Sequence, residues 1–295
     1  ELKKMSKTIS GNQQVKHVGT ISANNESDIG TLIASLFEKV GSTGAITVEE
    51  GKTLTHEIEV VEGLKFDRGY QSPYFITNTK NSTCEMENPL ILIANAKVSS
   101  IQQIYKYLEA AATQNKPLLI ISEDIDSEPL AALILNKLKG HLRVCAVKAP
   151  SFGNNRTQQL SDIGILTSGE MINPEIGMSL ETCDTAILGS AKKVIIDKDN
   201  TIIIGGSGSE VEINKRVDQI KSEAAAATSE YDREKLTERA AKLSGGVGVI
   251  KVGGATEVEV KEAKDRLNDA IQATRCALEE GIVIGGGCAL LYASQ

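Results

Sequence analysis

One glycine pattern in the sequence could bind a phosphate group. Gly206-Ser207-Gly208 follows a predicted strand and precedes a predicted helix, where dinucleotide-binding proteins place the glycines that contact a pyrophosphate. Val211 stands in place of the third glycine of that fingerprint, and Ser209 with Glu212 fits an ordinary helix-capping box. The pattern therefore allows two interpretations. One is the cofactor site of a nucleotide-dependent enzyme with a Rossmann-like domain, and the other, which is simpler, is the ordinary start of a helix.

Other patterns typical of catalysis or metal binding are missing. The sequence has neither the Gly-x-x-x-x-Gly-Lys-Ser/Thr loop of P-loop nucleotidases nor the Gly-x-Ser-x-Gly turn of hydrolases. Its histidines are scattered and its cysteines include no Cys-x-x-Cys pair, so a structural zinc site is not expected. The cysteines fit buried, reduced thiols in a reducing compartment. They are Cys84, Cys145, Cys183, Cys276 and Cys288.

Two features near the end of the sequence could touch a ligand. Asp269 lies within a predicted helix but off its inward-facing stripe, so spacing alone favours a solvated carboxylate. Gly285-Gly286-Gly287 interrupts an apolar helical pattern, although each glycine costs about 1 kcal/mol in helix propensity. Such a run suggests that another group approaches the backbone closely. That group is either a ligand phosphate or sugar, or a second helix.

Aromatic residues are rare, at 3% of the chain, but most of them gather in one region. They are Phe66, Tyr70, Tyr74, Phe75, Tyr105 and Tyr107. The first four belong to a loop-like segment that Gly69 and Pro73 interrupt, and large rings in a loop either fill a core or make a sticky surface. Of two predicted helices nearby, the one from Glu128 is apolar on more than one face. Because a helix on a sheet buries one face, its second apolar face is either buried elsewhere or exposed for a partner.

The composition limits the kinds of partner. The chain has 295 residues, 41% of them hydrophobic and 24% charged, with a formal net charge of −7. This acidic balance and the scarcity of aromatic rings argue against a general nucleic-acid binder. No apolar run approaches the roughly 20 residues that span a membrane. Both ends read as interrupted helices, so we expect a fragment of a longer chain, in which a missing targeting signal says nothing about compartment.

The middle of the sequence has the pattern of an α/β domain. Continuous apolar runs at 90–93, 118–121, 144–147 and 194–196 predict strands. Helices are predicted near 99–114, 128–139 and 156–166. Buried strands that alternate with helices favour a sheet with a parallel core that is covered on both faces.

The flanking sections are predicted to be mainly helical. A helix is predicted over 23–40 and a β-hairpin over 45–61, turning at Glu50-Gly51. Three long helices are predicted at 209–227, 229–243 and 256–280. We therefore predict an α/β domain inserted into a mainly helical one. Gly63 and Gly246 lie where the chain would cross between them, as hinges or as ordinary turns.

Taken together, several motifs resemble those of the group I chaperonins, the GroEL type, over essentially the whole chain. In chain order they are Val18-Gly19-Thr20-Ile21-Ser22-Ala23-Asn24, Val60-Val61-Glu62-Gly63, Phe66-Asp67-Arg68-Gly69-Tyr70, Ser72-Pro73-Tyr74-Phe75, Lys116-Pro117-Leu118-Leu119-Ile120-Ile121, Lys148-Ala149-Pro150, Tyr231-Asp232-Arg233-Glu234-Lys235-Leu236, Ala273-Thr274-Arg275 and Glu279-Glu280-Gly281 with Gly285-Gly286-Gly287. Cys84-Glu85 and Gly287-Cys288-Ala289-Leu290-Leu291 look more like the mitochondrial members than the bacterial ones.

The resemblance implies a division into domains. Residues 5–61 and 248–279 would form the two parts of the intermediate domain, and residues 62–247 the apical, substrate-binding domain. Residues 1–4 and 280–295 would be remnants of the equatorial domain, which carries most of the ATP site. The intact protein would then hydrolyse ATP with Mg²⁺, whereas these residues alone would show no turnover.

The resemblance also implies roles for residues near the nucleotide and the hinge. Asp269 matches an aspartate that orients the attacking water and completes the Mg-ATP site. Gly286 matches a glycine that contacts the nucleotide. Gly63 and Gly246 match the hinge of the apical domain.

A third set of positions matches residues that meet other polypeptides. Arg68 and Glu257 match an ion pair between neighbouring subunits. The positions that match apical residues holding unfolded polypeptide, and then the co-chaperonin lid, are Tyr70, Tyr74, Phe75, Tyr105, Leu108, Leu130, Ile134, Leu135 and Asn136. Tyr105 stands where the family usually has Leu, and Ser151 where it has Gly. Pro129 stands where Ala is common, which the first turn of a helix tolerates.

The expected activity is therefore that of an ATP-dependent chaperone, which captures unfolded polypeptides on an apolar groove and releases them into a closed ring cavity. The expected partners are unfolded polypeptides, a co-chaperonin and further copies in a ring that is heptameric by resemblance, with neither nucleic acid nor membrane. The expected compartment is the mitochondrial matrix or a related organelle, with bacterial cytoplasm as the alternative. A peptide-binding module without ATP coupling is a third possible function.

Overall fold

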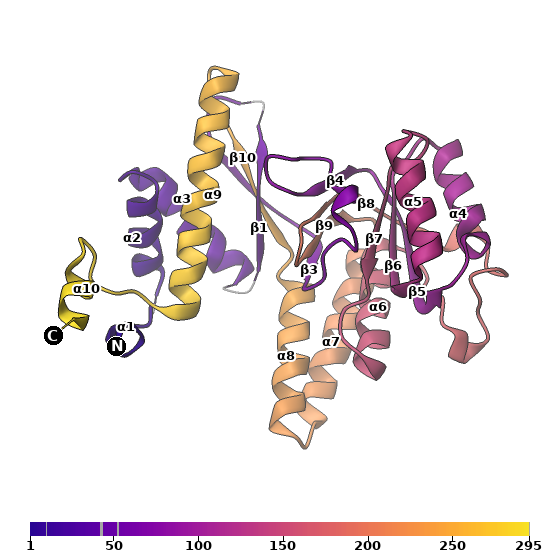
Figure 1. The fold of residues 1–295 in the computed structure, drawn as a ribbon. Coiled ribbons are helices and arrows are strands. Elements are labelled where there is room, and N and C mark those ends of the chain that lie inside the picture. Colours follow the sequence, from indigo (N-terminus) through magenta and orange to yellow (C-terminus); the bar gives the residue numbers. More distant parts are fainter. Residues whose placement is uncertain (10, 42–43, 52, 295) are drawn as a thin grey trace. The chain divides into compact units, whose positions relative to one another are not determined.

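The computed structural model describes residues 1–9, 11–41, 44–51 and 53–294. The chain forms two compact units (Figure 1), of which the smaller contains Glu1–Val61 and Val247–Gln295 and the larger contains Glu62–Gly246. The larger unit is thus one continuous stretch of sequence, which is inserted in the chain between the two segments of the smaller unit. Each unit has its own sheet and its own hydrophobic core.

The larger unit is built on a mixed sheet of seven strands. The strands are β3 (Gly63–Phe66), β4 (Cys84–Glu87), β5 (Leu90–Val98), β6 (Leu118–Ile125), β7 (Val144–Lys148), β8 (Gly189–Ile196) and β9 (Thr201–Gly206). Their order is β3-β9-β8-β5-β6-β7, and β4 pairs with β8. β5, β6 and β7 are parallel, while the other pairs are antiparallel. The predicted α/β fold with a parallel core is confirmed.

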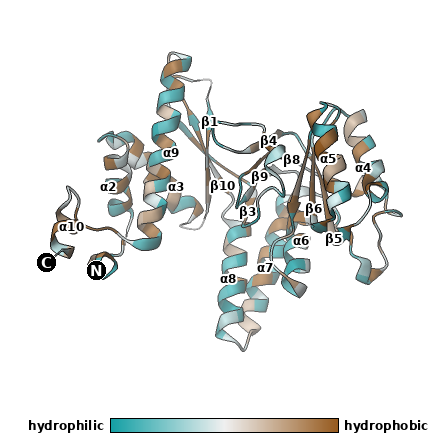
Figure 2. Ribbon diagram, viewed as in Figure 1, coloured by the Kyte–Doolittle hydropathy of each residue, from teal (hydrophilic) through white to brown (hydrophobic). Residues whose placement is uncertain are grey.

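The parallel strands are buried because helices pack against them. These helices are α4 (Ile101–Thr113), α5 (Ser127–Leu138) and α6 (Gly153–Thr167). α4 packs on β5 and α5 on β7, while α6 packs on β5 and β8. β5 and β7 are consequently almost continuously buried runs, such as Leu90-Ile91-Leu92-Ile93, rather than alternating ones. Figure 2 shows this contrast between the hydrophobic central strands and the largely hydrophilic α8 (Glu230–Ser244).

A helical hairpin completes the larger unit. α7 (Glu210–Ala226) packs against α8 and α6, and α8 packs against β3. The Ser229 hydroxyl accepts a hydrogen bond from the backbone N–H of Asp232 and so caps α8, in agreement with the helix predicted from residue 229. The capping box predicted at Ser209 is wrong: α7 begins there, but the Ser209 side chain makes no capping hydrogen bond with any described residue.

The smaller unit combines helices with a three-stranded sheet. Its helices are α1 (Leu2–Met5), α2 (Asn12–Ser22), α3 (Ser27–Val40), α9 (Glu257–Glu280) and α10 (Cys288–Ala293). Its strands are β1 (Ala45–Glu50), β2 (Glu57–Val61) and β10 (Val247–Val252). The inward stripe of α9, including Leu267, Ala270 and Ile271, is buried against α2, α3 and the sheet, as its spacing predicts.

The predicted hairpin over 45–61 is wrong, although its two strands exist. β10 lies between β1 and β2, parallel to β1 and antiparallel to β2. Sequence pattern missed β10 because Gly245-Gly246 and Gly248 resemble turn punctuation. Gly248 instead makes room inside the sheet, since a Cβ there would lie 2.7 Å from Cδ1 of Leu36 on α3.

The cysteines differ in environment. Cys84 and Cys145 are buried, and burial raises the pKa of the Cys145 thiol. Cys183 is half-buried, while Cys276 and Cys288 are exposed, which corrects the prediction that all five are buried. All five are free thiols.

None of the helices in the described ranges is long and apolar enough to cross a lipid bilayer.

Candidate functional site

The candidate site begins with α4, whose first turn is fixed by its own side chains. Ser100 caps the helix in a capping box with Gln103, whose Oε1 accepts a hydrogen bond from the Ser100 backbone N–H at 3.2 Å. Ile104, Leu108 and the other residues of the buried stripe face the core. Tyr105 lies outside this stripe, so its ring is left in solvent.

The second element, α5, carries apolar residues on both its inner and outer faces. Leu133 is fully buried, whereas Leu130 and Ile134 are half-buried against the core. Leu135 and Leu138 are exposed. The prediction from its sequence is therefore resolved: within the larger unit the described residues leave the second apolar face of α5 uncovered.

A short backbone segment before β4 forms the third element. The Tyr70 and Gln71 N–H groups donate to the carbonyl oxygens of Asp197 and Ala146, at 3.2 Å and 2.9 Å. The chain then makes a 3₁₀ turn, η1 (Pro73–Phe75), which packs against α5. Lys137 of α5 donates from Nζ to the carbonyl oxygens of Tyr74 at 2.5 Å and Ile76 at 2.8 Å. η1 and α5 are thus fastened together by a buried core and two charge-assisted hydrogen bonds.

Together these elements present a set of solvent-facing apolar side chains, which we call the apolar surface. Its most accessible members are each 55–62% exposed, and they are Tyr74, Tyr105, Leu135 and Leu138. Half-buried Leu130 and Ile134 complete it on α5. Sequence matching did not include Leu138, although it follows Ile134 and Leu135 at the helical spacings of four and three.

Two predicted contact residues are not on this surface. Phe75 is 0% exposed, because η1 turns its ring into the core of the larger unit. Leu108 is 6% exposed, because it lies one turn after Ile104 on the buried stripe of α4. In this structure Phe75 and Leu108 pack in the core beneath the apolar surface rather than facing solvent. Tyr70 and Asn136 are half-buried, and the Asn136 amide donates to the Ala132 carbonyl of its own helix at 2.8 Å.

The glycine pattern that suggested a nucleotide cofactor has another explanation. A Cβ at Gly206 would lie 2.2 Å from the Leu166 carbonyl oxygen, and one at Gly208 would lie 2.1 Å from that of Ile165. The Gly208 N–H already donates to Leu166 O at 2.8 Å. These glycines therefore let the end of α6 approach the chain closely, and this N–H is not available to a phosphate.

The residues matched to the nucleotide site belong to the smaller unit. Asp269 is exposed on α9, in agreement with its position off the buried stripe. Gly286 has φ +67°, and no described atom lies within 4 Å of a Cβ built there or at Gly285 and Gly287. The left-handed turn before α10 explains the need for glycine at 286 and 287, and close packing by another helix is not seen in the described chain.

These residues alone do not fit a complete Mg-nucleotide site. Among the described residues, no group of three or more His, Cys, Asp or Glu side chains could hold a metal ion. One exposed carboxylate at Asp269 is too few ligands for a magnesium ion that the protein itself must hold.

The predicted hinge glycines lie at the starts of strands, while the predicted ion-pair residues lie in the loop after β3 and at the start of α9. Gly63 begins β3, paired with Ile204 of β9, and Gly246 has φ +64° directly before β10. Arg68 lies over the ring of Phe152, with its guanidinium carbon 5.5 Å from the ring centroid. Glu257 is exposed at the first turn of α9.

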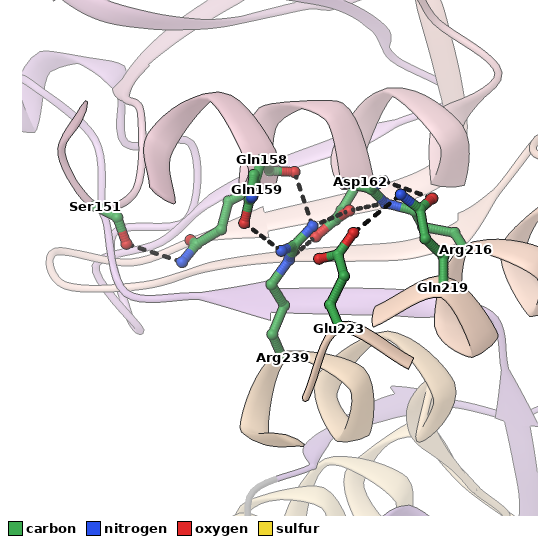
Figure 3. Close-up of polar contacts among 8 residues, drawn as sticks. All are labelled: Ser151, Gln158, Gln159, Asp162, Arg216, Gln219, Glu223 and Arg239. Carbon is green, nitrogen blue, oxygen red and sulfur yellow. Dashed lines mark hydrogen bonds and ion pairs between the residues drawn. The ribbon is translucent and has the colours of Figure 1, made fainter. Parts of the chain in front are cut away.

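A buried ionic cluster that no sequence pattern indicated joins α6 to the helical hairpin (Figure 3). Asp162 is 3% exposed, and its carboxylate accepts hydrogen bonds from Arg216 Nε at 2.7 Å and from Arg239 Nη2 at 2.8 Å. Arg239 Nη1 also donates to Gln158 Oε1 at 2.6 Å. The cluster borders a cleft of about 710 Å³, whose walls come from β3, α6 and α8. It holds the hairpin against the core that carries the apolar surface.

Comparison with known proteins places the chain in a family. The model of the TCP-1/cpn60 chaperonin family matches residues 2–295. The chain therefore belongs to the TCP-1/cpn60 chaperonin family, which confirms the resemblance seen in the sequence.

Individual relatives are similar along the whole chain. It is 56% identical over 294 residues to the mitochondrial chaperonin CPN60-1 of Cucurbita maxima and 55% identical over 294 residues to the mitochondrial chaperonin CPN60 of Arabidopsis thaliana. It is 56% identical to the mitochondrial chaperonin CPN60-2 of Zea mays. In each case the match covers 100% of this chain but 51% of the relative, so the chain spans about half the length of these proteins.

Proposed function

We propose that the larger unit captures unfolded polypeptides on the apolar surface, as the substrate-binding part of a chaperonin. The observation that carries this proposal is the exposure of Tyr74, Tyr105, Leu135 and Leu138 on elements that a core and hydrogen bonds hold in place. Folded proteins rarely leave such groups of apolar side chains in water without a partner. Family membership favours an unfolded polypeptide as that partner.

The chemistry of the surface suits an unselective, weak contact. Buried apolar area contributes about 25 cal/mol per Å², whatever the sequence that supplies it. One surface therefore binds an unfolded segment weakly. Several copies in a ring raise the effective concentration, and such avidity reaches about 10²–10⁴ when copies bind one client together. The ring, heptameric by resemblance, is part of the proposal.

The remaining parts of the cycle belong to the complete protein. We propose that ATP and Mg²⁺ bind mainly to a part of the protein outside these residues, with Asp269 and Gly286 completing the site. The larger unit would act as the apical domain and turn at Gly63 and Gly246, and Arg68 would pair with Glu257 of a neighbouring subunit. A co-chaperonin would then take the apolar surface and free the client. The names of the relatives favour the mitochondrial matrix.

Capture of a client tests the proposal directly. Tyr74→Glu and Leu135→Ser remove exposed apolar area, so each is expected to weaken binding of a fluorescently labelled, chemically unfolded protein about fivefold or more. Because both side chains are exposed, the melting temperature should change little. Val211→Ser on α7 removes a 62% exposed apolar side chain from the same unit, outside the apolar surface, and should bind as the wild type does. Unchanged capture by both test variants would contradict the proposal.

Two further measurements distinguish the proposed function from a nucleotide-cofactor enzyme and from a peptide-binding module without ATP coupling. A nucleotide-cofactor enzyme would quench or enhance nicotinamide fluorescence on titration, and the occupied Gly208 N–H predicts no change. A peptide-binding module without ATP coupling would capture the client but keep it when the complete protein receives ATP and Mg²⁺.

A further inference from the structure

The flank of α4 that lies away from α5 is fastened to the backbone of a neighbouring segment. Tyr107 is fully buried, and its hydroxyl lies 3.2 Å from the Leu180 carbonyl oxygen and 3.3 Å from that of Cys183. A phenol has a single O–H to donate, so these two carbonyls share it. Burial raises the pKa of Tyr107 to about 12, and the hydroxyl keeps its proton at physiological pH.

The neighbouring side chain strengthens the same attachment. Lys106 donates from Nζ to the Glu181 carbonyl oxygen at 2.8 Å and also to that of Cys183. Its ammonium group lies 5.1 Å from the centroid of the Tyr107 ring, close enough for a cation–π contact. We call the segment Leu180–Cys183, with its carbonyl groups, the brace.

The brace is itself held by the core. Leu180 is buried in the hydrophobic core of the larger unit. A turn closes the segment, in which the Thr182 N–H donates to Ser179 Oγ at 3.2 Å and the Cys183 N–H donates to Ser179 O at 3.2 Å. α4 therefore attaches to a fixed point rather than to a loose loop.

Helical geometry separates the brace from the apolar surface. At about 100° per residue, Tyr107 forms one edge of the buried stripe of α4 and Lys106 lies outside that edge, whereas Ile101 and Tyr105 lie outside the opposite edge. The packing agrees, because α4 contacts both η3 (Thr185–Ile187), which closely follows the brace, and α5, which packs on β7 at the edge of the sheet. α4 is thus positioned between the brace and α5.

We propose that Tyr107 and Lys106 are positioning residues, which fasten α4 to the brace and so set the spacing between α4 and α5 across the apolar surface. This inference rests on the proposed function, since it states that binding of an unfolded polypeptide depends on the distance between α4 and α5. Neither residue needs to touch the client. If the brace is released, α4 can rotate or shift, and Tyr105 no longer meets an unfolded segment together with Leu135.

The experiment compares Tyr107→Phe, Lys106→Met and the double variant in the complete protein. Tyr107→Phe keeps the ring and removes only the hydroxyl, while Lys106→Met keeps most of the stem and removes the donors. The double variant is expected to capture a labelled unfolded protein about threefold to tenfold more weakly, as for a lost hydrogen bond that is coupled to binding. Amide hydrogen exchange is expected to accelerate in α4 and to stay unchanged in α6.

Two further variants serve as controls. Tyr231→Phe removes an exposed tyrosine hydroxyl on α8, far in sequence from the brace, and should leave both measurements unchanged. Lys106→Arg keeps a cation that donates hydrogen bonds, so it should restore most of the capture that Lys106→Met loses.

The outcomes are distinguishable. Capture and α4 exchange equal to the wild type in the double variant would overturn the inference and leave the proposed function intact. Faster exchange throughout the larger unit would also overturn it, because the contacts would then serve general stability rather than the position of α4. A wild-type protein that captured no unfolded client would overturn the proposed function and the inference together.

Discussion

At the scale of single residues, type and spacing say less than burial does. Tyr105 and Tyr107 are nearby tyrosines on one helix, yet Tyr105 is exposed and Tyr107 is the largest fully buried side chain among the described residues. The hydroxyl of Tyr105 can hydrogen-bond to water, whereas Tyr107 must satisfy its hydroxyl inside the protein. The carbonyls of Leu180 and Cys183 supply that partner.

The buried hydroxyl of Tyr107 predicts a dependence of stability on alkaline pH. Its pKa in the folded protein is about 12, against 10.0 as the ordinary value. Below pH 10 Tyr107 is protonated in both the folded and the unfolded state, so its contribution to the free energy of unfolding is fully present. Between pH 10 and pH 12 only the unfolded state ionises, so the free energy of unfolding falls, by roughly 3 kcal/mol in total.

Urea unfolding at a series of pH values from 8 to 12 measures this effect. The difference between the wild type and Tyr107→Phe isolates Tyr107 from other groups that titrate in the same range. Parallel curves for the two proteins across pH 10–12 would show that the folded and unfolded states bind this proton equally well.

At the scale of elements, one buried carboxylate joins three helices. Asp162 on α6 pairs with Arg216 from α7 and with Arg239 from α8, two helices that follow α6 in the chain only after β8 and β9. Removing one member of such a cluster leaves the other charges buried and unpaired, which costs more than the cluster itself contributes. Asp162 therefore adds a buried ionic contact to the apolar packing that already holds the hairpin in the core.

Asp162→Asn is expected to lower the free energy of unfolding by about 3–5 kcal/mol, because it leaves two half-buried guanidinium groups without their anion. Glu238→Gln on α8 is the matched control, since it removes a more exposed carboxylate that pairs with Lys235 and Lys242. That change should cost less than about 1 kcal/mol. Equal losses in urea unfolding for both variants would contradict the central role of Asp162.

At the scale of the whole molecule, the two units carry different parts of the proposed cycle. The apolar surface lies entirely in Glu62–Gly246, while Asp269 and Gly286 lie in the other unit. We therefore predict that the proposed binding of a client and the proposed hydrolysis of ATP can be separated by mutation. This separation is expected of a machine in which nucleotide chemistry is converted into a change of binding surface.

Asp269→Ala in the complete protein is predicted to lower the rate of ATP hydrolysis by at least about 10-fold while changing the Kd for ATP less than that. The physical reason is that an exposed carboxylate can orient a water and a magnesium ion without contributing most of the binding contacts. Steady-state kinetics measure the rate of ATP hydrolysis, and equilibrium nucleotide binding measures the Kd for ATP. Glu262→Ala, which removes another exposed carboxylate of α9, serves as the control, and near-normal turnover by Asp269→Ala would refute the role.

The sequence by itself determined the α/β class, the parallel strands β5 to β7 and most helices, because periodicity and continuous apolar runs are local signals of burial. Its motifs also determined the family. It could not decide that β10 enters between β1 and β2, that Phe75 and Leu108 turn inward, or that Asp162 meets Arg216 and Arg239. Those facts depend on contacts between residues far apart in the chain, and only the folded structure brings such residues together. For the same reason, only the folded structure shows which apolar side chains of η1, α4 and α5 remain exposed on the apolar surface.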